Sequence, residues 1–237
     1  MVRKPLMPVV LVAVLAALAL WASLVSWSMA ALNWGLVSTL LLLVILALLM
    51  WSTGRQPINT MVISVTAALA ALASLGRILF ASLPSVQPVT FLVLLSGYVF
   101  GSGTGFIIGM LTGLISNFFL GHGPWTLWQM IAWGICGLLG GFLGRGRRDL
   151  ALMPFLIMSV LAAFLFGIFL NTWHWLNLVY PLTWTTWGAT WASSILFDTM
   201  HAAGNVIFAI IFARPFFNYL VRYRNRFLPT DDLTSQP

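Results

Sequence analysis

Two ionisable residues stand in apolar sequence, where an isolated charge is costly. Arg77 closes an alanine-rich apolar stretch, and Asp198 lies in another. Asp198, His201 and Asn205 follow one another at intervals of three and four residues, so they share one face of a helix. Inside a membrane such a polar stripe faces the bundle interior and typically binds polar or charged groups. The alternative, that the stripe only fixes helix packing through hydrogen bonds, stays open.

Further polar residues and most tryptophans fall on the same side of the expected topology. Nine of the twelve tryptophans lie there, although aromatic belts normally form at both membrane interfaces. We therefore expect some of them to pack against a ligand, with interfacial anchoring as the alternative. The residues expected to contact a ligand are Arg77, Gln87, Asn117, Trp125, Trp128, Gln129, Trp173, His174, Asp198, His201 and Asn205.

The sequence lacks catalytic and metal-binding patterns. No serine has the GxSxG-like setting of an intramembrane protease, and the phosphate-loop pattern GxxxxGK[ST] does not occur. The histidines His122, His174 and His201 include no pair at i and i+4 and no HExxH pattern. We therefore expect a binding protein, not an enzyme, with no metal and no cofactor.

Composition indicates a membrane protein. Of 237 residues, 61% are hydrophobic and only 6% are charged, against about 25% charged residues in soluble domains. The net charge of +7 comes almost wholly from arginine, because Lys4 is the only lysine. In a membrane chain this charge marks cytoplasmic loops and does not indicate nucleic-acid binding. The single cysteine, Cys136, excludes an intramolecular disulfide.

A spanning helix needs about 20 apolar residues, and eight such segments fit the chain. The first follows Arg3 and Lys4 but is long enough to span, so we expect a mature helix and not a cleaved signal peptide. The fold class is therefore an all-α polytopic membrane protein, with an N-terminal hairpin (1–56), a six-helix core (57–220) and a cytoplasmic tail (221–237). The expected spans are residues 8–29, 34–51, 58–81, two short helices within 88–120, then 125–143, 150–170 and 189–217, with an aromatic outer segment at 171–188.

The region 88–120 decides the topology. One helix of this length would measure about 50 Å, well beyond a bilayer core of about 30 Å. A turn at residues 101–104 instead places nearly all basic residues on one side, as the positive-inside rule requires. We therefore expect two helices, with both chain termini cytoplasmic. The basic residues on that side are Arg3, Lys4, Arg55, Arg145, Arg147, Arg148, Arg214, Arg222, Arg224 and Arg226.

Glycines recur every four residues through the same region. Gly97, Gly101, Gly105, Gly109 and Gly113 allow helix backbones to approach closely, which favours tight packing and not phosphate binding.

Several short motifs follow one another in a recognisable order over residues 58–225. An alanine-rich helix ends at Arg77, and the glycine-rich pair of helices follows. In this order the chain resembles the substrate-binding subunit (S component) of energy-coupling factor vitamin transporters. The further motifs that carry the resemblance are Gln87-Pro88-Val89-Thr90, Gly123-Pro124-Trp125-Thr126 with Trp128-Gln129, and Phe197-Asp198 through His201 to Asn205.

The resemblance implies a six-helix core that captures a vitamin-like small molecule at the outer face of a bacterial or archaeal cell membrane. Cobalamin is slightly preferred over riboflavin-like heterocycles by the resemblance alone, while Arg77 suits an anionic or carbonyl-bearing group. The implied partners are a transmembrane coupling subunit and two ATP-binding cassette ATPases. Docking on the coupling subunit is expected through small residues of the first core helix, namely Ala67, Ala70, Ala71 and Ser74.

Two other functions stay open. A membrane scaffold similar to the rod-shape protein MreD would have no ligand, and a solitary permease would have no ATPase partners. Pairing is the cheapest arrangement for two charges in a membrane, so we also expect Arg77 and Asp198 to approach each other, directly or through His201 or a bound ligand.

Overall fold

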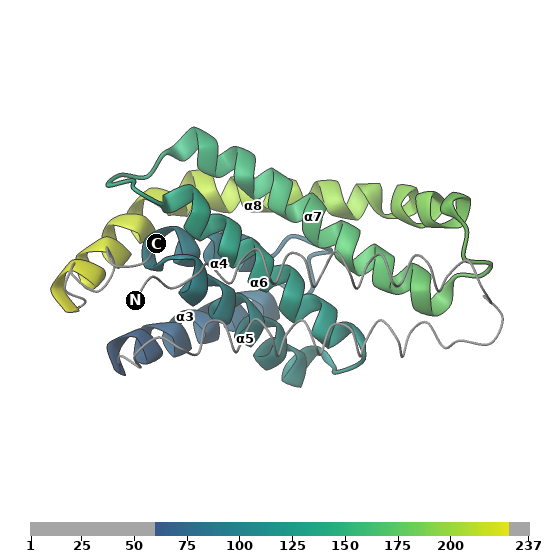
Figure 1. The fold of residues 1–237 in the computed structure, drawn as a ribbon, viewed down its shortest axis with the longest axis horizontal. Helices are drawn as coiled ribbons and strands as arrows, with labels where there is room; N and C mark the ends of the chain where they lie inside the picture. Colours follow the sequence, from purple (N-terminus) through teal and green to yellow (C-terminus); the bar gives the residue numbers. More distant parts are fainter. Residues whose placement is uncertain (1–59, 228–237) are drawn as a thin grey trace, which may run out of the picture. The chain divides into compact units, whose positions relative to one another are not determined.

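The computed structural model describes residues 60–227, and every regular element in this range is an α-helix (Figure 1). The chain divides into two compact units, 1–57 and 58–237, and the described helices all belong to the second. The all-α prediction is therefore confirmed for this unit. The helices are α3 (Thr60–Leu79), α4 (Val89–Phe100), α5 (Ser102–Leu120), α6 (Trp125–Gly144), α7 (Leu152–Leu178) and α8 (Trp184–Phe227).

Five of these helices are long and apolar enough to cross a membrane. The sixth, α4, has only 12 residues, about 18 Å, and is too short for a regular span. The segments expected at 8–29 and 34–51 lie outside the described residues. The expected count of eight spans is therefore not supported, because the prediction assumed that every apolar segment crosses the full bilayer.

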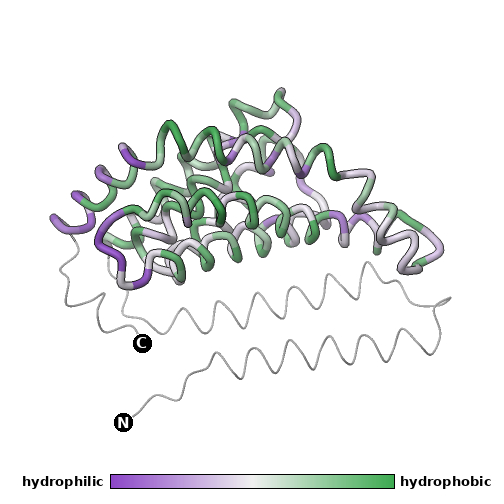
Figure 2. Tube along the Cα trace, turned by 90° about the horizontal axis from the view of Figure 1, so that it is seen from above, coloured by the Kyte–Doolittle hydropathy of each residue, from purple (hydrophilic) through white to green (hydrophobic). Residues whose placement is uncertain are grey.

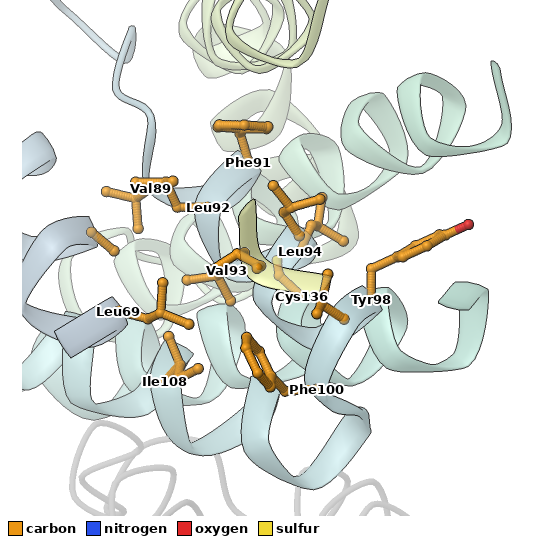
Figure 3. Close-up of a cluster of buried hydrophobic side chains, with 14 of the residues drawn as sticks. Leu69, Val89, Phe91, Leu92, Val93, Leu94, Tyr98, Phe100, Ile108 and Cys136 are labelled. Carbon is orange, nitrogen blue, oxygen red and sulfur yellow. The ribbon is translucent and has the colours of Figure 1, made fainter. Parts of the chain in front are cut away.

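Helix α4 is short because it lies inside the protein. All of its residues are buried, and a helix that is apolar on every side belongs in a core. Figure 3 shows Leu69 of α3, Ile108 of α5 and Cys136 of α6 gathered around the side chains of α4. A helix that is shielded from lipid along its length does not have to match the bilayer thickness.

The predicted break within residues 88–120 is confirmed. Gly101 separates α4 from α5 with a φ of 90° and a ψ of 167°, a conformation that side chains disfavour and glycine adopts freely. Its N–H closes α4 on the carbonyl of Gly97, and its carbonyl accepts the first hydrogen bond of α5 from Gly105. The chain therefore reverses at one glycine, without the longer turn expected at 101–104.

Contacts between neighbouring helices fix their directions. Gly109 lies against Trp133 and Gly113 against Met130, so α5 and α6 are antiparallel. The contacts between the other helices give their directions in the same way. Along two parallel helices the residue numbers of successive contact pairs rise together, and along two antiparallel helices they change in opposite senses. Helices α3, α5 and α7 therefore run in one direction and α4, α6 and α8 in the other.

Glycines bring three of the helices into backbone contact. A methyl group added at Gly137 of α6 would overlap the carbonyl oxygen of Gly105 in α5, and one at Gly97 of α4 would overlap the carbonyl oxygen of Gly137. The glycine repeat therefore serves close packing, as expected.

The α7–α8 hairpin differs from the predicted layout. Helix α7 continues to Leu178 and α8 already begins at Trp184, so most of the outer segment expected at 171–188 is helical. Helix α8 has 44 residues, about 66 Å, and includes Pro215. It runs past residue 220, where we expected the core to end, and Val221 and Tyr223 beyond that point still pack against the hydrophobic core.

Basic residues gather at one end of these helices. The Arg224 guanidinium donates to the carbonyl of Val99 (3.0 Å), and the Tyr98 hydroxyl donates to the carbonyl of Asp149 (2.8 Å). These contacts bring the α4–α5 break, the basic loop after α6 and the end of α8 together. Figure 2 shows hydrophilic residues at the ends of α6 and α8. The basic residues of the loop after α6 and of the end of α8 therefore lie at the same end of the described helices, as predicted.

Candidate functional site

A polar cavity of about 160 Å³ lies where α3 ends and α4 begins, away from the basic residues and beside the middle parts of α7 and α8. Its wall comes from α3, α4, α6, α7, α8 and the connection between α3 and α4. Four of the residues predicted to bind a ligand lie in this wall, from four separate segments of the chain. The lining residues are Arg77, Ser85, Gln87, Val89, Gln129, Trp133, Phe166 and His201.

Arg77 is the charged group of the cavity. One of its terminal nitrogens, Nη1, donates to the Ser116 hydroxyl (2.7 Å) and to the Asn117 side-chain oxygen (2.6 Å). Its guanidinium also lies over the ring of Trp133, 4.8 Å from the centroid. Nε is buried without a partner, and no described residue accepts a hydrogen bond from Nη2. A buried donor without a partner costs about 1–3 kcal/mol, so this arrangement needs a reason.

No carboxylate among the described residues neutralises Arg77. Asp149 lies at the basic end, where its carbonyl is bonded to Tyr98. Asp198 accepts hydrogen bonds from Asn171 and Ser194. The cavity wall therefore carries an uncompensated positive charge.

The N-terminus of α4 adds partial positive charge to the cavity. Val89, the first residue of α4, lines the cavity, and the preceding Pro88 provides no side-chain cap. Asn205 of α8 takes over this role in part, because its side-chain oxygen accepts the N–H of Phe91 (3.1 Å). The unpaired N–H groups of a helix N-terminus favour anions nearby.

A hydrogen-bonded series crosses the cavity floor. The indole N–H of Trp133 donates to the Thr90 hydroxyl (3.1 Å), which lies 2.9 Å from Nε2 of His201. Because Thr90 accepts from Trp133, its own proton is free to point to Nε2 of a neutral His201. Phe166 meets the His201 ring edge-on at 5.3 Å. Helices α4, α6 and α8 are thus joined by one series of hydrogen bonds, and α7 covers it with the ring of Phe166.

Asn117 connects Arg77 to the loop between α5 and α6. Its side-chain amide donates to the Thr126 hydroxyl (2.8 Å) and to Oε1 of Gln129 (2.8 Å), while its oxygen accepts from Arg77. The Thr126 hydroxyl in turn accepts the N–H of Gly123 (3.3 Å). Asn117 therefore orients both Arg77 and Gln129 and supports the cavity without lining it.

Residues 55–226 of the chain match a protein family described as a family of unknown function (DUF6580). The chain belongs to this family. The matched range covers the described helices and leaves out nearly all of the first compact unit. No curated protein and no solved structure matches this DUF6580 chain. Its site therefore has to be interpreted from its own geometry.

Asp198 lies outside the cavity of the DUF6580 protein. Its carboxylate accepts from Asn171 (3.2 Å) and Ser194 (2.9 Å) between α7 and α8, where Gly167 leaves room for it. The expected direct pair with Arg77 is therefore wrong. The polar stripe on α8 does not face a single neighbouring helix. Asp198 contacts α7, whereas Asn205 forms a hydrogen bond to α4.

The predicted tryptophan contacts also lie outside the cavity wall. Trp125 meets Trp173 edge-on at 5.7 Å, Trp128 contacts Phe169, and His174 is exposed beside Trp173. The three tryptophans and Phe169 pack between α6 and α7, whereas His174 does not.

The aromatic residues that do line the cavity are Trp133 and Phe166, which sequence reasoning missed. Trp133 follows Gln129 by four positions and therefore shares its helix face, so that spacing was a usable signal. Phe166 has no comparable signal in an apolar helix.

The predicted docking face on α3 divides into two parts. Ala70 and Ser74 are buried, and the Ser74 hydroxyl lies 3.4 Å from the carbonyl of Thr112 in α5. These two residues belong to internal packing, which corrects the prediction. Ala67 and Ala71 are exposed and stay available to a partner.

Proposed function

We propose that this DUF6580 protein is a membrane-embedded solute-binding subunit that captures a small molecule beside Arg77 for import. One observation carries the proposal, namely that half-buried Arg77 lines a polar cavity with a buried, unpartnered Nε and with no carboxylate among the described residues to balance its charge. A site that serves only packing is expected to pair such a charge within the protein. A ligand that enters the cavity would supply the missing acceptors.

The size of the cavity favours a small solute. Its volume of about 160 Å³ is below the roughly 300–1,000 Å³ of common ligand pockets. A riboflavin-like heterocycle requires the cavity to open, and cobalamin is larger still. We therefore place the expected ligand at the small end of the vitamin-like range.

ATP-driven uptake would require partner subunits, because the sequence contains no nucleotide-binding pattern of its own. The resemblance to S components supports a complex with a transmembrane coupling subunit and two ATP-binding cassette ATPases. Ala67→Trp and Ala71→Trp on the exposed face of α3 are expected to abolish uptake while ligand binding persists. Ile157→Trp, at an exposed position of α7, is the matched control. Loss of binding together with uptake would contradict docking at this face.

We further propose a multi-pass protein of the bacterial or archaeal cell membrane, with both termini and the basic end in the cytoplasm. Counting the two expected N-terminal segments and α4 gives eight membrane segments. The positive-inside rule supports this orientation, and it makes the cavity accessible from outside. In a Cys136→Ala background, a cysteine at His122 is expected to react with an impermeant reagent on intact cells, and a cysteine at Ser102 is expected to be protected. The reverse pattern would contradict the orientation.

Native mass spectrometry of gently purified protein tests capture itself. A small bound molecule is expected in the wild type and in Arg145→Ala, which alters an exposed arginine at the basic end. The same molecule is expected to be missing from Arg77→Ala. Absence of any bound molecule from all three proteins would favour an MreD-like scaffold, and uptake without ATPase partners would favour a solitary permease.

A further inference from the structure

We propose that the solute is a small monocarboxylate whose carboxylate binds the Nε–Nη2 edge of Arg77. This inference rests on the proposed solute capture and specifies the chemistry of that same site. It follows from the donors that the cavity leaves unused, from its charge and from the character of its remaining wall.

The hydrogen bonds of Arg77 leave one edge of the guanidinium unused. Ser116 and Asn117 both bond Nη1, which fixes the orientation of the planar group. Nε is buried without a partner, so a ligand oxygen reaches it only when the cavity wall opens around it, and the described residues provide no acceptor for Nη2. Neighbouring N–H groups on one guanidinium edge match the two oxygens of a carboxylate in a bidentate pair. A neutral amide or alcohol would satisfy this edge less completely.

The charge of the wall favours one negative charge on the ligand. Among the described residues that line the cavity, Arg77 is the only Lys or Arg and none is Asp or Glu. The α4 N-terminus contributes only partial positive charge. A monocarboxylate balances this wall, whereas a phosphate dianion would leave negative charge unpaired in a poorly solvated site. The geometry therefore favours carboxylate over phosphate.

The rest of the wall suits a short apolar body with one hydrogen-bond acceptor. The rings of Trp133 and Phe166 lie 4.6 Å apart between centroids and form an apolar side. Gln129 accepts from Asn117 through Oε1, which leaves its amide N–H groups to donate. Gln87 adds a second amide at the opening between α3 and α4. A short acid that carries a carbonyl or hydroxyl group meets all of these features.

Matched acids and amides test the carboxylate directly. Purified full-length protein is mixed with a series of monocarboxylates from propanoate to benzoate, with the corresponding primary amides, and with inorganic phosphate. Thermal unfolding and calorimetry then report binding. We expect at least one acid to bind and to raise the unfolding temperature, while its amide and phosphate do not.

Variants of Arg77 assign the contact. Arg77→Gln is expected to weaken the effective acid about a hundredfold, as for loss of a charged hydrogen-bond pair. Arg77→Lys keeps the charge but loses the planar edge, so we expect about tenfold weaker binding. Arg145→Gln, at the basic end, is the control and is expected to bind like the wild type. Because Arg77→Lys retains the cation, it keeps the test valid if Arg77→Gln fails to fold.

Each outcome has a defined meaning. Equal binding of acid and amide, binding of phosphate alone, binding that survives Arg77→Gln, or no binding by any acid would overturn the carboxylate assignment. A neutral molecule found by native mass spectrometry would overturn it too, yet would leave solute capture standing. Arg77-dependent binding of an acid without uptake by cells would leave the carboxylate site standing and overturn the import function.

Discussion

In the part of the bundle formed by α3 to α6, Arg77 keeps its buried Nε without a partner, whereas in the α7–α8 hairpin Asp198 accepts two hydrogen bonds from its own pair of helices. The first part is joined by backbone contact at glycines such as Gly137. In the hairpin, hydrogen bonds between side chains connect α7 to α8, as with Asn171. Arg77 and Asp198 therefore lie in parts of the bundle whose helices are held together by different kinds of contact.

Under the proposed function, this difference separates a group that binds solute, Arg77, from a group that holds the structure together, Asp198. Proteins that otherwise satisfy their polar groups leave exceptions at functional sites, and a rigid frame has to support them. The glycine contacts supply such a frame around Arg77, while Asp198 serves to join two helices. Four predictions test this separation, from the largest expected effect to the smallest.

The first prediction concerns the frame. In Gly137→Ala, the new methyl group meets the backbone of Gly105, which has no flexible end to move away. Overpacking costs typically about 1–3 kcal/mol and more against backbone, so we expect the unfolding temperature to fall by about 6 °C or more. Gly188→Ala is the matched control, because nothing lies within 4 Å of its added methyl. Equal stability of both variants would show that α5 and α6 are not held rigidly.

The second prediction contrasts the two ionisable groups by ligand binding. Asp198→Asn is expected to leave the affinity for the co-purified solute within about twofold, as for a site that shares no partner with the ligand. Asn117→Ala is expected to weaken it about tenfold, because Arg77 loses a partner that orients it. Calorimetry measures both. A large loss in Asp198→Asn would mean that the hairpin belongs to the binding site.

The third prediction concerns the space beside Gly167 that the Asp198 side chain occupies. In Gly167→Ala, the methyl group would overlap the Asp198 carboxylate, which is the end of a side chain and can move. We expect a loss of about 1–2 kcal/mol, or about 2–8 °C in unfolding temperature. Adding Asp198→Ala removes the overlap, so the double variant is expected to be more stable than the sum of the single effects predicts. Additive losses would argue against this contact.

The fourth prediction concerns the start of α8. The Thr186 hydroxyl accepts the indole N–H of Trp175 (2.9 Å) and the N–H of Thr183 (3.1 Å). Thr186→Val is expected to cost about 1 kcal/mol, or roughly 2–4 °C, without a change in binding. Thr185→Val, at the exposed neighbouring position, is the control. Altered binding in Thr186→Val would show that the hairpin end also controls the cavity.

Much of the local structure followed from the sequence alone. The apolar composition predicted helices able to cross a membrane, and the positions of five such helices agree with it. The need to place the basic residues on one side predicted the break that Gly101 makes. These are local or whole-chain properties, because the conformation of a glycine, the hydropathy of a segment and the net charge depend little on which helices become neighbours.

The candidate site was predictable only in part. Arg77, Gln87, Gln129 and His201 were expected and line one cavity, yet Asp198 faces α7 and the predicted tryptophans lie elsewhere. Periodicity shows which residues share a face of their own helix, but it does not show which neighbour that face meets. Here glycine contacts set the distances and rotations of α4, α5 and α6, and Gly167 opened a place for Asp198 on α7. Tertiary packing therefore decided which polar groups meet, because side chains of several helices must share one space.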